Sequence, residues 1–259
     1  MGKIIAIANQ KGGVGKTTTA VNLTAALGNL GKKTLLIDID PQGNATSGMG
    51  VTKKESLSVY DLIIGEKKAS EVITKTKFKN VDIIASSMAL AGAEVEMVSL
   101  EDRVYRLKKT ITCVKENYDF ILIDCPPSLG LITLNALVAC DTVMMPIQCE
   151  YYALEGLSQL MSTVRQVKRL YNETIDVEGV LLTMFVGRLN LTIQVVKEVK
   201  KYFPKKVYKT VISRNVRVSE APSYGEPVLY YDRNSKGAHN YNDLAKEVIK
   251  MNKKIKGAI

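Results

Sequence analysis

The chain alternates short apolar runs with longer stretches in which apolar residues recur at helical spacing. Residues 3–8 (KIIAIA) form the first apolar run, and residues 33–38 (KTLLID) form the second. Between them, from Thr17 to about Leu30, apolar residues recur every three or four positions, which predicts a helix. The order strand, glycine-rich loop, helix, strand is typical of the opening of a parallel α/β sheet.

The same alternation continues to the end of the chain. Several later runs are apolar at nearly every position, as expected for strands that helices cover on both faces. The pattern predicts an α/β fold with a doubly wound, mostly parallel sheet of about seven or eight strands flanked by helices. We expect residues 1–259 to form a single domain, because no linker or repeat interrupts the pattern. The further predicted strands are 81–86, 120–125, 141–147, 177–185 and 206–212, and the further helices are 153–171, 191–203 and 238–254.

The segment after the first strand, NQKGGVGKTT, has the composition of a phosphate-binding loop. Residues 15–17 (GKT) satisfy the second half of the pattern G-x4-G-K-T, whereas Gln10 occupies the place of its first glycine. The glycines let backbone N–H groups face phosphate oxygens, and the following helix adds its positive end. Lys16 is expected to contact the β and γ phosphates, and Thr17 to bind Mg²⁺. The residues predicted to surround the nucleotide are Lys11, Gly12, Gly13, Val14, Gly15, Lys16, Thr17 and Thr18.

Three carboxylates stand at the ends of other predicted strands. Asp38 and Asp40 lie in LLIDIDPQGN, and Asp124 lies in FILIDCPPS. An apolar strand that ends in Asp beside a phosphate loop is the usual support of the magnesium shell, so we expect Asp124, with Thr17 and Asp38, to bind Mg²⁺. Asp40 begins a Pro-Gln-Gly segment and is expected to orient the attacking water. The alternative is that these acids only cap loops.

The net charge of +10 belongs to the last part of the chain. Residues 1–187 contain 20 Lys and Arg against 20 Asp and Glu, whereas residues 188–259 contain 16 against 6. A one-sided basic surface suggests a polyanionic partner such as nucleic acid or an anionic membrane. From charge alone, a solvated lysine-rich face is an equally good explanation.

The cysteines and the apolar runs indicate the cellular compartment of the protein. Cys113, Cys125, Cys140 and Cys149 include no CxxC pair, and the chain has a single histidine, which argues against a zinc site or a disulfide framework. We interpret them as buried thiols in a reducing compartment. No apolar run approaches the roughly 18 residues that span a bilayer, and no signal peptide precedes the first strand. We therefore expect a cytoplasmic protein.

Five motifs in the same order resemble the deviant Walker A ATPases of the ParA/MinD family. They are KGGVGKTT, DIDPQGNAT, IDCPPSLG, QCEYYALEGL and RNVRVSEAPSYGEPV, and they look most like those of chromosomal ParA (Soj) proteins. The resemblance covers residues 3 to about 240. It implies the fold of a P-loop NTPase and a Mg²⁺-dependent ATPase that partitions chromosomes or plasmids. It further implies an ATP-bound homodimer that binds double-stranded DNA non-specifically on the nucleoid, with release when a ParB-like partner stimulates hydrolysis.

The resemblance also offers a role for the extra lysine of the glycine loop. In members of this family the first lysine of K-G-G-x-G-K-T reaches across a dimer interface to the phosphates of the partner's ATP. Lys11 is therefore implied to act in trans, where a second cation stabilises charge only when two subunits face each other. With Lys16 and the water-orienting Asp40 it completes the expected catalytic set.

The family pattern also indicates the DNA-binding and adenine-binding residues. It implies DNA contacts by the arginine after LLTMFVG, which is Arg188, and by Arg217 in RNVRVSEA. The segment with Ser213 and Asn215 is expected to lie against the adenine. Val186 stands where chromosomal relatives usually carry Asp, and Ser213 where they tend to have Pro, so the adenine contacts depart from the family pattern in detail. Further lysines expected to contact DNA phosphates are Lys197, Lys200, Lys201, Lys236, Lys246 and Lys250.

A MinD-like, membrane-associated positioning ATPase is the main alternative. Its signature is a C-terminal amphipathic helix, and an apolar stripe of Leu244, Val248, Met251 and Ile255 runs along the last predicted helix. The stripe lacks the Phe or Trp of interfacial anchors, so we expect it to pack on the core, without stable membrane binding.

Two other classes with similar loops fit the sequence less well. An iron–sulfur reductase needs two neighbouring cluster ligands, but no cysteine follows Cys125 until Cys140. A tyrosine autokinase ends in a tyrosine-rich tail, whereas Tyr230, Tyr231 and Tyr241 precede or begin a predicted helix.

Overall fold

The computed structural model describes residues 2–52, 57–65, 67–150, 153–187 and 189–253. Its first half contains β1 (Lys3–Ile7), α1 (Lys16–Asn29), β2 (Thr34–Asp38), α2 (Asn44–Gly48), α3 (Val59–Ile63), α4 (Ala69–Val72), β3 (Thr74–Lys75), β4 (Val81–Ile84), α5 (Leu90–Glu96), α6 (Arg106–Ile111) and β5 (Phe120–Asp124). Its second half contains α7 (Leu131–Ala139), β6 (Thr142–Gln148), α8 (Ala153–Leu170), β7 (Asp176–Thr183), α9 (Asn190–Tyr202), α10 (Val216–Glu220), α11 (Val228–Tyr231) and α12 (Lys236–Lys253). Short 3-10 turns follow α5, α6 and α10.

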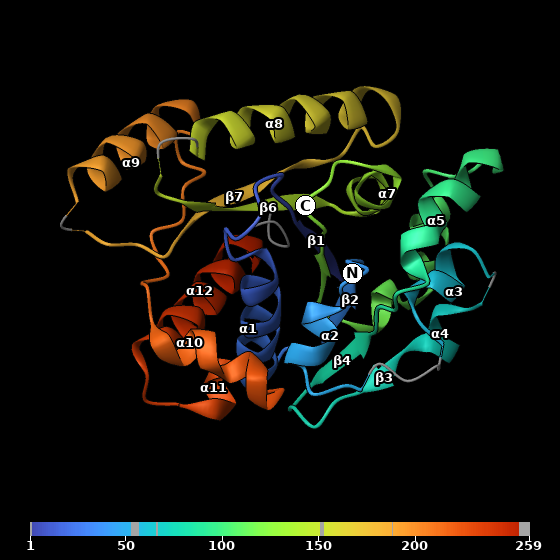
Figure 1. Ribbon diagram of the computed structural model, residues 1–259, viewed down its shortest axis with the longest axis horizontal. Coiled ribbons are helices and arrows are strands. Elements are labelled where there is room, and N and C mark those ends of the chain that lie inside the picture. Colours follow the sequence, from blue (N-terminus) through green and yellow to red (C-terminus); the bar gives the residue numbers. More distant parts are fainter. Residues whose placement is uncertain (1, 53–56, 66, 151–152, 188, 254–259) are drawn as a thin grey trace.

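The described strands form one seven-stranded sheet in the order β3-β4-β2-β5-β1-β6-β7. Every neighbouring pair is parallel except β3 with β4. The chain runs from β1 outward to β4, returns to β5 beside β1, and then continues to β7 on the other side (Figure 1). This confirms the predicted doubly wound, mostly parallel α/β fold. In such a sheet, ligands bind beyond the carboxyl ends of the strands where the order reverses.

Helices cover both faces of the sheet, and alternate strand residues serve two separate cores. Ile4 and Ala6 of β1 point into one core, and Ile5 and Ile7 point into the other. The first core receives residues of α3 to α9, and the second receives residues of α1, α2 and α10 to α12. Figure 1 shows α8 and α9 on one side of β6 and β7, with α1 and α12 on the other. This two-sided burial explains why the strands are apolar at nearly every position.

The prediction of a strand at residues 206–212 is wrong, although the segment does run beside β7. It contributes only isolated bridges, between Val180 and Val207 and between Phe185 and Ser213. Between these bridges the carboxylate of Glu247 accepts hydrogen bonds from the backbone N–H groups of residues 209 and 210, at 2.8 and 2.9 Å. Because α12 satisfies these donors, they are lost to the sheet and the ladder breaks. The seventh strand is instead β3, whose two residues carry no apolar signal.

The cysteines are all free thiols, but they do not share one environment. Cys125 and Cys140 are buried, whereas Cys113 is exposed and Cys149 is half-buried. The expectation of buried thiols is therefore wrong for Cys113, which lies on the solvent side of a short 3-10 turn. Burial raises the pKa of the Cys125 thiol well above its usual range, so this neighbour of Asp124 is held in its neutral form.

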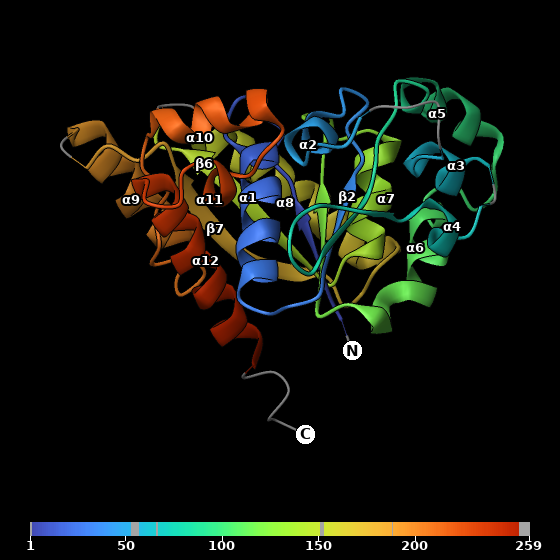
Figure 2. The ribbon, with the colours of Figure 1, turned by 90° about the horizontal axis from the view of Figure 1, so that it is seen from below.

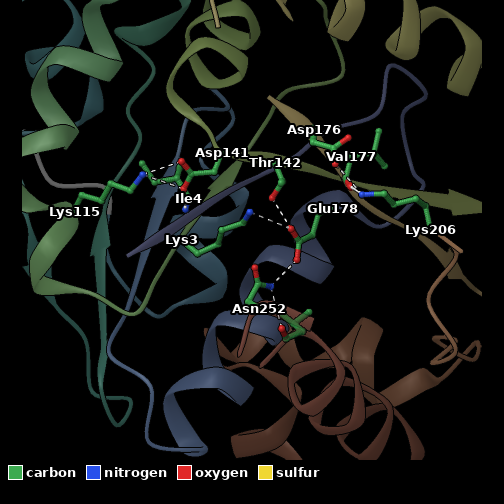
Figure 3. A network of polar contacts seen from close by, with 11 residues as sticks. Lys3, Ile4, Lys115, Asp141, Thr142, Asp176, Val177, Glu178, Lys206 and Asn252 are labelled. Carbon is green, nitrogen blue, oxygen red and sulfur yellow. Dashed lines mark hydrogen bonds and ion pairs between the residues drawn. The ribbon is translucent and has the colours of Figure 1, made fainter. Parts of the chain in front are cut away.

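A polar network closes the edge of the sheet at the amino ends of the strands. Glu178 of β7 is buried and accepts hydrogen bonds from the hydroxyl of Thr142, at 2.6 Å, and from the amide of Asn252, at 2.7 Å (Figure 3). Lys3 adds an ion pair at 3.6 Å. Asn252 lies in the last turn of α12, so the network ties that helix to three strands. Figure 2 places the N-terminus at this edge, with α2 and α10 at the opposite one.

Candidate functional site

The glycine loop leaves β1 at the carboxyl edge of the sheet and turns sharply into α1. Gly13 and Gly15 have φ angles of 73° and 85°, a left-handed conformation in which a side chain is strained. Asn9, which is buried, fixes the entrance of the loop. Its amide donates to the carbonyl of Pro146 at 2.7 Å, and its Oδ1 accepts from the backbone N–H of Lys11 at 3.0 Å. The shape of the loop is therefore set by its own sequence and by β6.

The amino end of α1 faces the loop with its positive dipole uncompensated. Gly15 occupies the N-cap position and provides no side-chain cap, and the first turn contains no acidic residue. A helix end of this kind is favourable for an anion such as phosphate. Val14 is buried, and the hydroxyl of Thr183 donates to its carbonyl at 2.8 Å, which anchors the loop from β7 as well.

Lys16, the first residue of α1, is buried within the loop. Its Nζ donates to the carbonyl oxygen of Lys11 at 3.1 Å. Burial lowers the pKa of Lys16, while the negative charges of Asp124 and Asp40 oppose that change. The backbone of Lys11 and the carboxylates of Asp40 and Asp124 thus lie near the Lys16 side chain.

Asp38 and Asp124 lie side by side because β2 and β5 are neighbours in the sheet. Their Cα atoms are register partners, and Asp124 is also paired with Ile7, the last residue of β1. Asp124 is fully buried. Within the described residues no hydrogen bond of good geometry reaches either of its carboxylate oxygens, although the hydroxyl of Thr17 lies close by. Burial and the nearby Asp38 raise the pKa of Asp124 well above its usual range, and the hydroxyl of Thr17 and the charge of Lys16 oppose the rise. A buried carboxyl group in this state is a strong candidate to bind a cation.

Asp38 is equally buried but, unlike Asp124, is fully engaged within the chain. Its Oδ2 accepts from the backbone N–H and the hydroxyl of Thr46, both at 2.7 Å, and its Oδ1 accepts from the backbone N–H of Asp40 at 3.1 Å. Burial raises the pKa of Asp38 to about 6, although the hydrogen bonds from Thr46 lower it. The first task of Asp38 in this arrangement is to hold the loop that carries Asp40.

Asp40 lies just beyond β2, at the start of the loop that leads to α2. It is nearly buried, and its Oδ1 accepts from the backbone N–H of Gln42 at 2.9 Å. The hydroxyl of Ser86 donates to its carbonyl oxygen at 2.7 Å. Ser86 and Thr46 were not predicted from the sequence, and nothing in their local pattern distinguishes them from ordinary loop hydroxyls.

Lys11 is directed toward an acid of its own chain. Its Nζ lies 2.6 Å from Oε2 of Glu150, which follows β6. Both side chains keep a substantial exposed fraction, 32% and 46%. Glu150 belongs to the motif QCEYYALEGL, so the motif marked the segment, but the sequence assigned no role to this residue. Among the described residues, no atom lies within 4 Å of the place where a Cβ of Gly12 would lie.

A cavity of about 310 Å³ opens beside the glycine loop. Gly15, Thr18, Ser213 and Asn215 are among the residues that line it. Asn215 caps α10 through its side chain, which accepts from the backbone N–H of Val218, so its amide is oriented by the helix. The structure thus brings the predicted adenine segment to the phosphate loop. Lining residues that the sequence did not indicate include Thr183, Met184, Pro222 and Tyr241.

The described residues do not by themselves form a closed metal cage. Within them, no group of three or more His, Cys, Asp or Glu side chains is arranged to hold a metal ion. Mg²⁺ usually keeps several waters and binds through one or two protein oxygens plus the phosphates of its nucleotide. The unpartnered Asp124 beside Thr17 fits that type of site.

The residues expected to contact DNA are exposed but do not gather into one patch. Lys197, Lys200 and Lys201 lie on α9, which packs on the first core, whereas Lys236, Lys246 and Lys250 lie on α12, which packs on the second. Both helices lie at the β7 end of the sheet in Figures 1 and 2. The first and last of the α12 lysines are separated by about 21 Å along the helix. Arg188 lies outside the described residues.

Arg217 is the member of the DNA set with the most defined geometry. It lies on α10, at the same edge as the glycine loop (Figure 2). Its Nη1 is 2.9 Å from Glu220, and its Nε is 3.3 Å from Asp232. The hydrogen bond and charge of Glu220 raise the pKa of Arg217.

The apolar stripe of the last helix faces the interior. Leu244 and Val248 are completely buried in the second core, and Met251 packs against it. Ile255, the fourth member of the stripe, lies outside the described residues. No helix in the described part of the chain is long and apolar enough to cross a membrane.

Known proteins resemble this chain in sequence over most of its length. Residues 2–177 match a family model described as an AAA domain. The chain is 60% identical over 249 residues to the sporulation initiation inhibitor protein Soj of Bacillus subtilis (strain 168), which covers 96% of this chain and 98% of the relative. The motifs read from the sequence therefore belong to a likeness that extends over nearly the whole chain.

Solved structures with the same fold carry nucleotide. The cobyrinic acid a,c-diamide synthase of Mycobacterium smegmatis, with bound ADP and magnesium, has a TM-score of 0.83 and 33% identity over 95% of this chain and 93% of that one. The septum site-determining protein MinD of Pyrococcus horikoshii OT3, complexed with Mg-ADP, has a TM-score of 0.81 and 28% identity over 97% of each chain. Since these two proteins carry different names, the shared fold alone does not identify the function of this chain in the cell.

Proposed function

Because the chain belongs to the ParA/Soj family of chromosome partitioning ATPases, we propose that it is an ATP-operated DNA-binding switch for chromosome or plasmid segregation. ATP would close a homodimer that binds double-stranded DNA non-specifically on the nucleoid, in the cytoplasm. A ParB-like partner would then stimulate hydrolysis and release the dimer. The observation that carries the proposal is the buried, unpartnered Asp124 beside the lysine and threonine that begin α1.

The glycine loop and α1 provide the phosphate site. Backbone N–H groups of the left-handed loop and the uncapped helix end attract the phosphate oxygens. Lys16 is already desolvated, so its charge acts on the β and γ phosphates with little screening by water. Ser213 and Asn215 line the adjoining cavity and would contact the adenine there.

Asp124 and Thr17 are the groups that we propose to hold Mg²⁺, with Asp38 beside them. Bound Mg²⁺ would neutralise charge that develops between the β and γ phosphates. Asp124 is suited to this role because, apart from the nearby Thr17 hydroxyl, no described group lies against its oxygens. Asp38 already accepts hydrogen bonds from Thr46 and Asp40, so it would support the site without being its main ligand.

Asp40 and Lys11 complete the proposed catalytic set. Asp40 has one carboxylate oxygen on Gln42, and its second would orient the attacking water. Lys11 would leave Glu150 when two copies meet and contact the partner's nucleotide. The open space at Gly12 suits a close approach of the second subunit at this point.

The DNA surface would be assembled from the β7 ends of two subunits. Arg188, Arg217, Lys197, Lys200, Lys201, Lys236, Lys246 and Lys250 are the proposed contacts. Dimerisation would double these weak phosphate contacts on one duplex, so ATP would control DNA affinity through avidity.

The proposal is tested by DNA binding of Asp40→Asn with ATP and with ADP at several salt concentrations. Asparagine keeps an oxygen that can accept from the N–H of Gln42, so the loop keeps this bond while the carboxylate is lost. We expect a stable ATP-bound dimer on DNA, no such dimer with ADP, and hydrolysis at least about 100-fold slower. A variant that stays monomeric with ATP, or hydrolyses at the normal rate, would contradict the proposal.

Liposome sedimentation with ATP, run beside the DNA assay, tests the MinD-like alternative. The burial of Leu244 and Val248 supports DNA rather than lipid as the partner, because the apolar stripe is already used by the core. ATP-dependent sedimentation with liposomes, without DNA binding, would favour the alternative.

A further inference from the structure

The loop that carries Asp40 is tied to a strand that is distant in the sequence. Ser86 follows β4 and is only 2% exposed. Its hydroxyl donates to the carbonyl oxygen of Asp40 at 2.7 Å, and its backbone N–H donates to the hydroxyl oxygen of Thr46 at 2.9 Å. One residue thus contacts both the beginning and the end of the loop from 40 to 46.

The inner side of the same loop is held by Asp38. The carboxylate of Asp38 accepts from the backbone N–H of Asp40 at one oxygen, and from the backbone N–H and hydroxyl of Thr46 at the other. The hydroxyl of Thr46 therefore donates to Asp38 and accepts from Ser86. These bonds are buried, so water does not replace any one of them when it is broken.

The backbone of Asp40 is fixed on both sides by these contacts. Its N–H is bound to Asp38. Its carbonyl accepts from Ser86 and, within the same loop, from the N–H of Gly43 at 2.8 Å, so the peptide groups before and after its Cα are both held. Fixing both peptide groups also fixes the direction of the bond from Cα to Cβ, and so the position from which the carboxylate leaves the backbone. Of the two anchors that lie outside the loop, Ser86 is the one that belongs to neither the phosphate loop nor the candidate magnesium site.

We propose that Ser86 is a positioning residue for Asp40. It holds the Asp40 loop in the conformation in which the carboxylate orients the attacking water, and it acts through the backbone of Asp40 without contact with the nucleotide. The inference rests on the proposed role of Asp40 in hydrolysis. The inference separates two functions of the site. The glycine loop binds ATP, whereas the hydroxyl of Ser86, just after β4, sets the rate at which bound ATP is hydrolysed.

Steady-state ATP hydrolysis by Ser86→Ala is the first test. Loss of the hydroxyl leaves the carbonyl of Asp40 bound only within its own loop, to the N–H of Gly43, so we expect kcat to fall about tenfold and KM for ATP to stay within about twofold. The ATP-bound dimer should persist longer on DNA, as expected for Asp40→Asn. Ser86→Thr, which keeps a hydroxyl at this position, should retain most of the normal kcat.

Ser87→Ala is the matched control. Ser87 lies on the same loop, and its hydroxyl lies 3.0 Å from that of Ser58, away from the Asp40 loop. We expect this variant to hydrolyse ATP at nearly the normal rate. If Ser86→Ala folds poorly, Ser86→Cys takes its place, because a thiol keeps the size of the side chain but is a weak donor.

A double-mutant cycle with Asp40→Asn separates positioning from a general loss of structure. If Ser86 acts through the Asp40 carboxylate, Ser86→Ala should lower kcat in the normal protein but should not lower it further in Asp40→Asn. An equal loss in both backgrounds, normal kcat in Ser86→Ala, or a parallel loss of ATP affinity would overturn the inference. Normal hydrolysis by Asp40→Asn alone would instead overturn the proposed function, so the two failures are distinct.

Discussion

Lys11 and Glu150 form an ion pair of 2.6 Å between the glycine loop and the segment that follows β6. The two residues are 139 positions apart in the chain, and the pair holds Lys11 on its own subunit. For Lys11 to reach a nucleotide in a second subunit, this contact must break. Because both side chains are substantially exposed, the pair contributes at most about 1 kcal/mol, a cost that a new contact with phosphate can exceed.

Glu150→Gln should make ATP-dependent dimerisation easier. Glutamine keeps the size of the side chain but not its charge, so Lys11 is released at no cost to the fold. We expect the dimer to form at about fivefold lower protein concentration, as measured by analytical ultracentrifugation of the Asp40→Asn protein with ATP. Glu155→Gln, an exposed neighbour on α8, is the control and should have no effect. Weaker dimerisation would instead mean that Glu150 serves the interface.

Gly12→Val should separate nucleotide binding from dimerisation. No atom of the described part of the chain lies within 4 Å of the added Cβ, and Gly12 is not in the left-handed conformation, so the monomer should fold and bind ATP with normal affinity. The branched side chain should prevent the close approach of a second subunit, which light scattering with ATP would detect.

Gly13→Val is the control for this experiment. At a φ of 73° a valine strains the loop by about 1–2 kcal/mol, so this variant should lose ATP affinity as well. Normal dimerisation by Gly12→Val would show that the glycine loop does not lie in the dimer interface.

Arg217→Ala should weaken DNA binding at every sequence and reduce its salt dependence. Each lost phosphate contact lowers the slope of log K against log salt by about 0.9, so a dimer should lose about 1.8. Fluorescence anisotropy with unrelated duplexes at several salt concentrations measures this. Lys75→Ala, at the opposite edge of the sheet on β3, should leave the slope unchanged. An unchanged slope in Arg217→Ala would exclude the arginine from the DNA surface.

Glu178→Ala should destabilise the fold without affecting the nucleotide site. The substitution leaves the buried hydroxyl of Thr142 without its acceptor and unties Asn252 of α12, so the free energy of unfolding should fall by about 3 kcal/mol. Urea denaturation measures the loss, and ATP affinity should be normal because the network lies at the far edge of the sheet. Asp176→Asn breaks a largely exposed ion pair with Lys206 and should cost less than about 1 kcal/mol. If the two variants lost equal free energy of unfolding, burial would not explain the contribution of Glu178.

The sequence located the core strands better than it located the edges. Strands β1, β2 and β5 are apolar at most positions because both faces are covered, and this signal is local. The segment 206–212 carries a similar run, but Glu247 of α12 removes two of its backbone donors, and no local pattern reveals that partner. Strand β3 was missed because it has only two residues, both polar and exposed, which give no apolar pattern.

By itself, the sequence determined the glycine loop, the helix that follows it and the carboxylates at the strand ends. These depend on backbone freedom at glycine and on the spacing of apolar residues, which are properties of short segments. Only the tertiary structure decided that β2 and β5 are neighbours, which sets Asp38 against Asp124, and that Glu150 and Ser86 reach the site. The physical reason is that a hydrogen bond or ion pair between distant residues depends on the packing of whole strands, whereas the residues that make it look like any other polar side chains in the sequence.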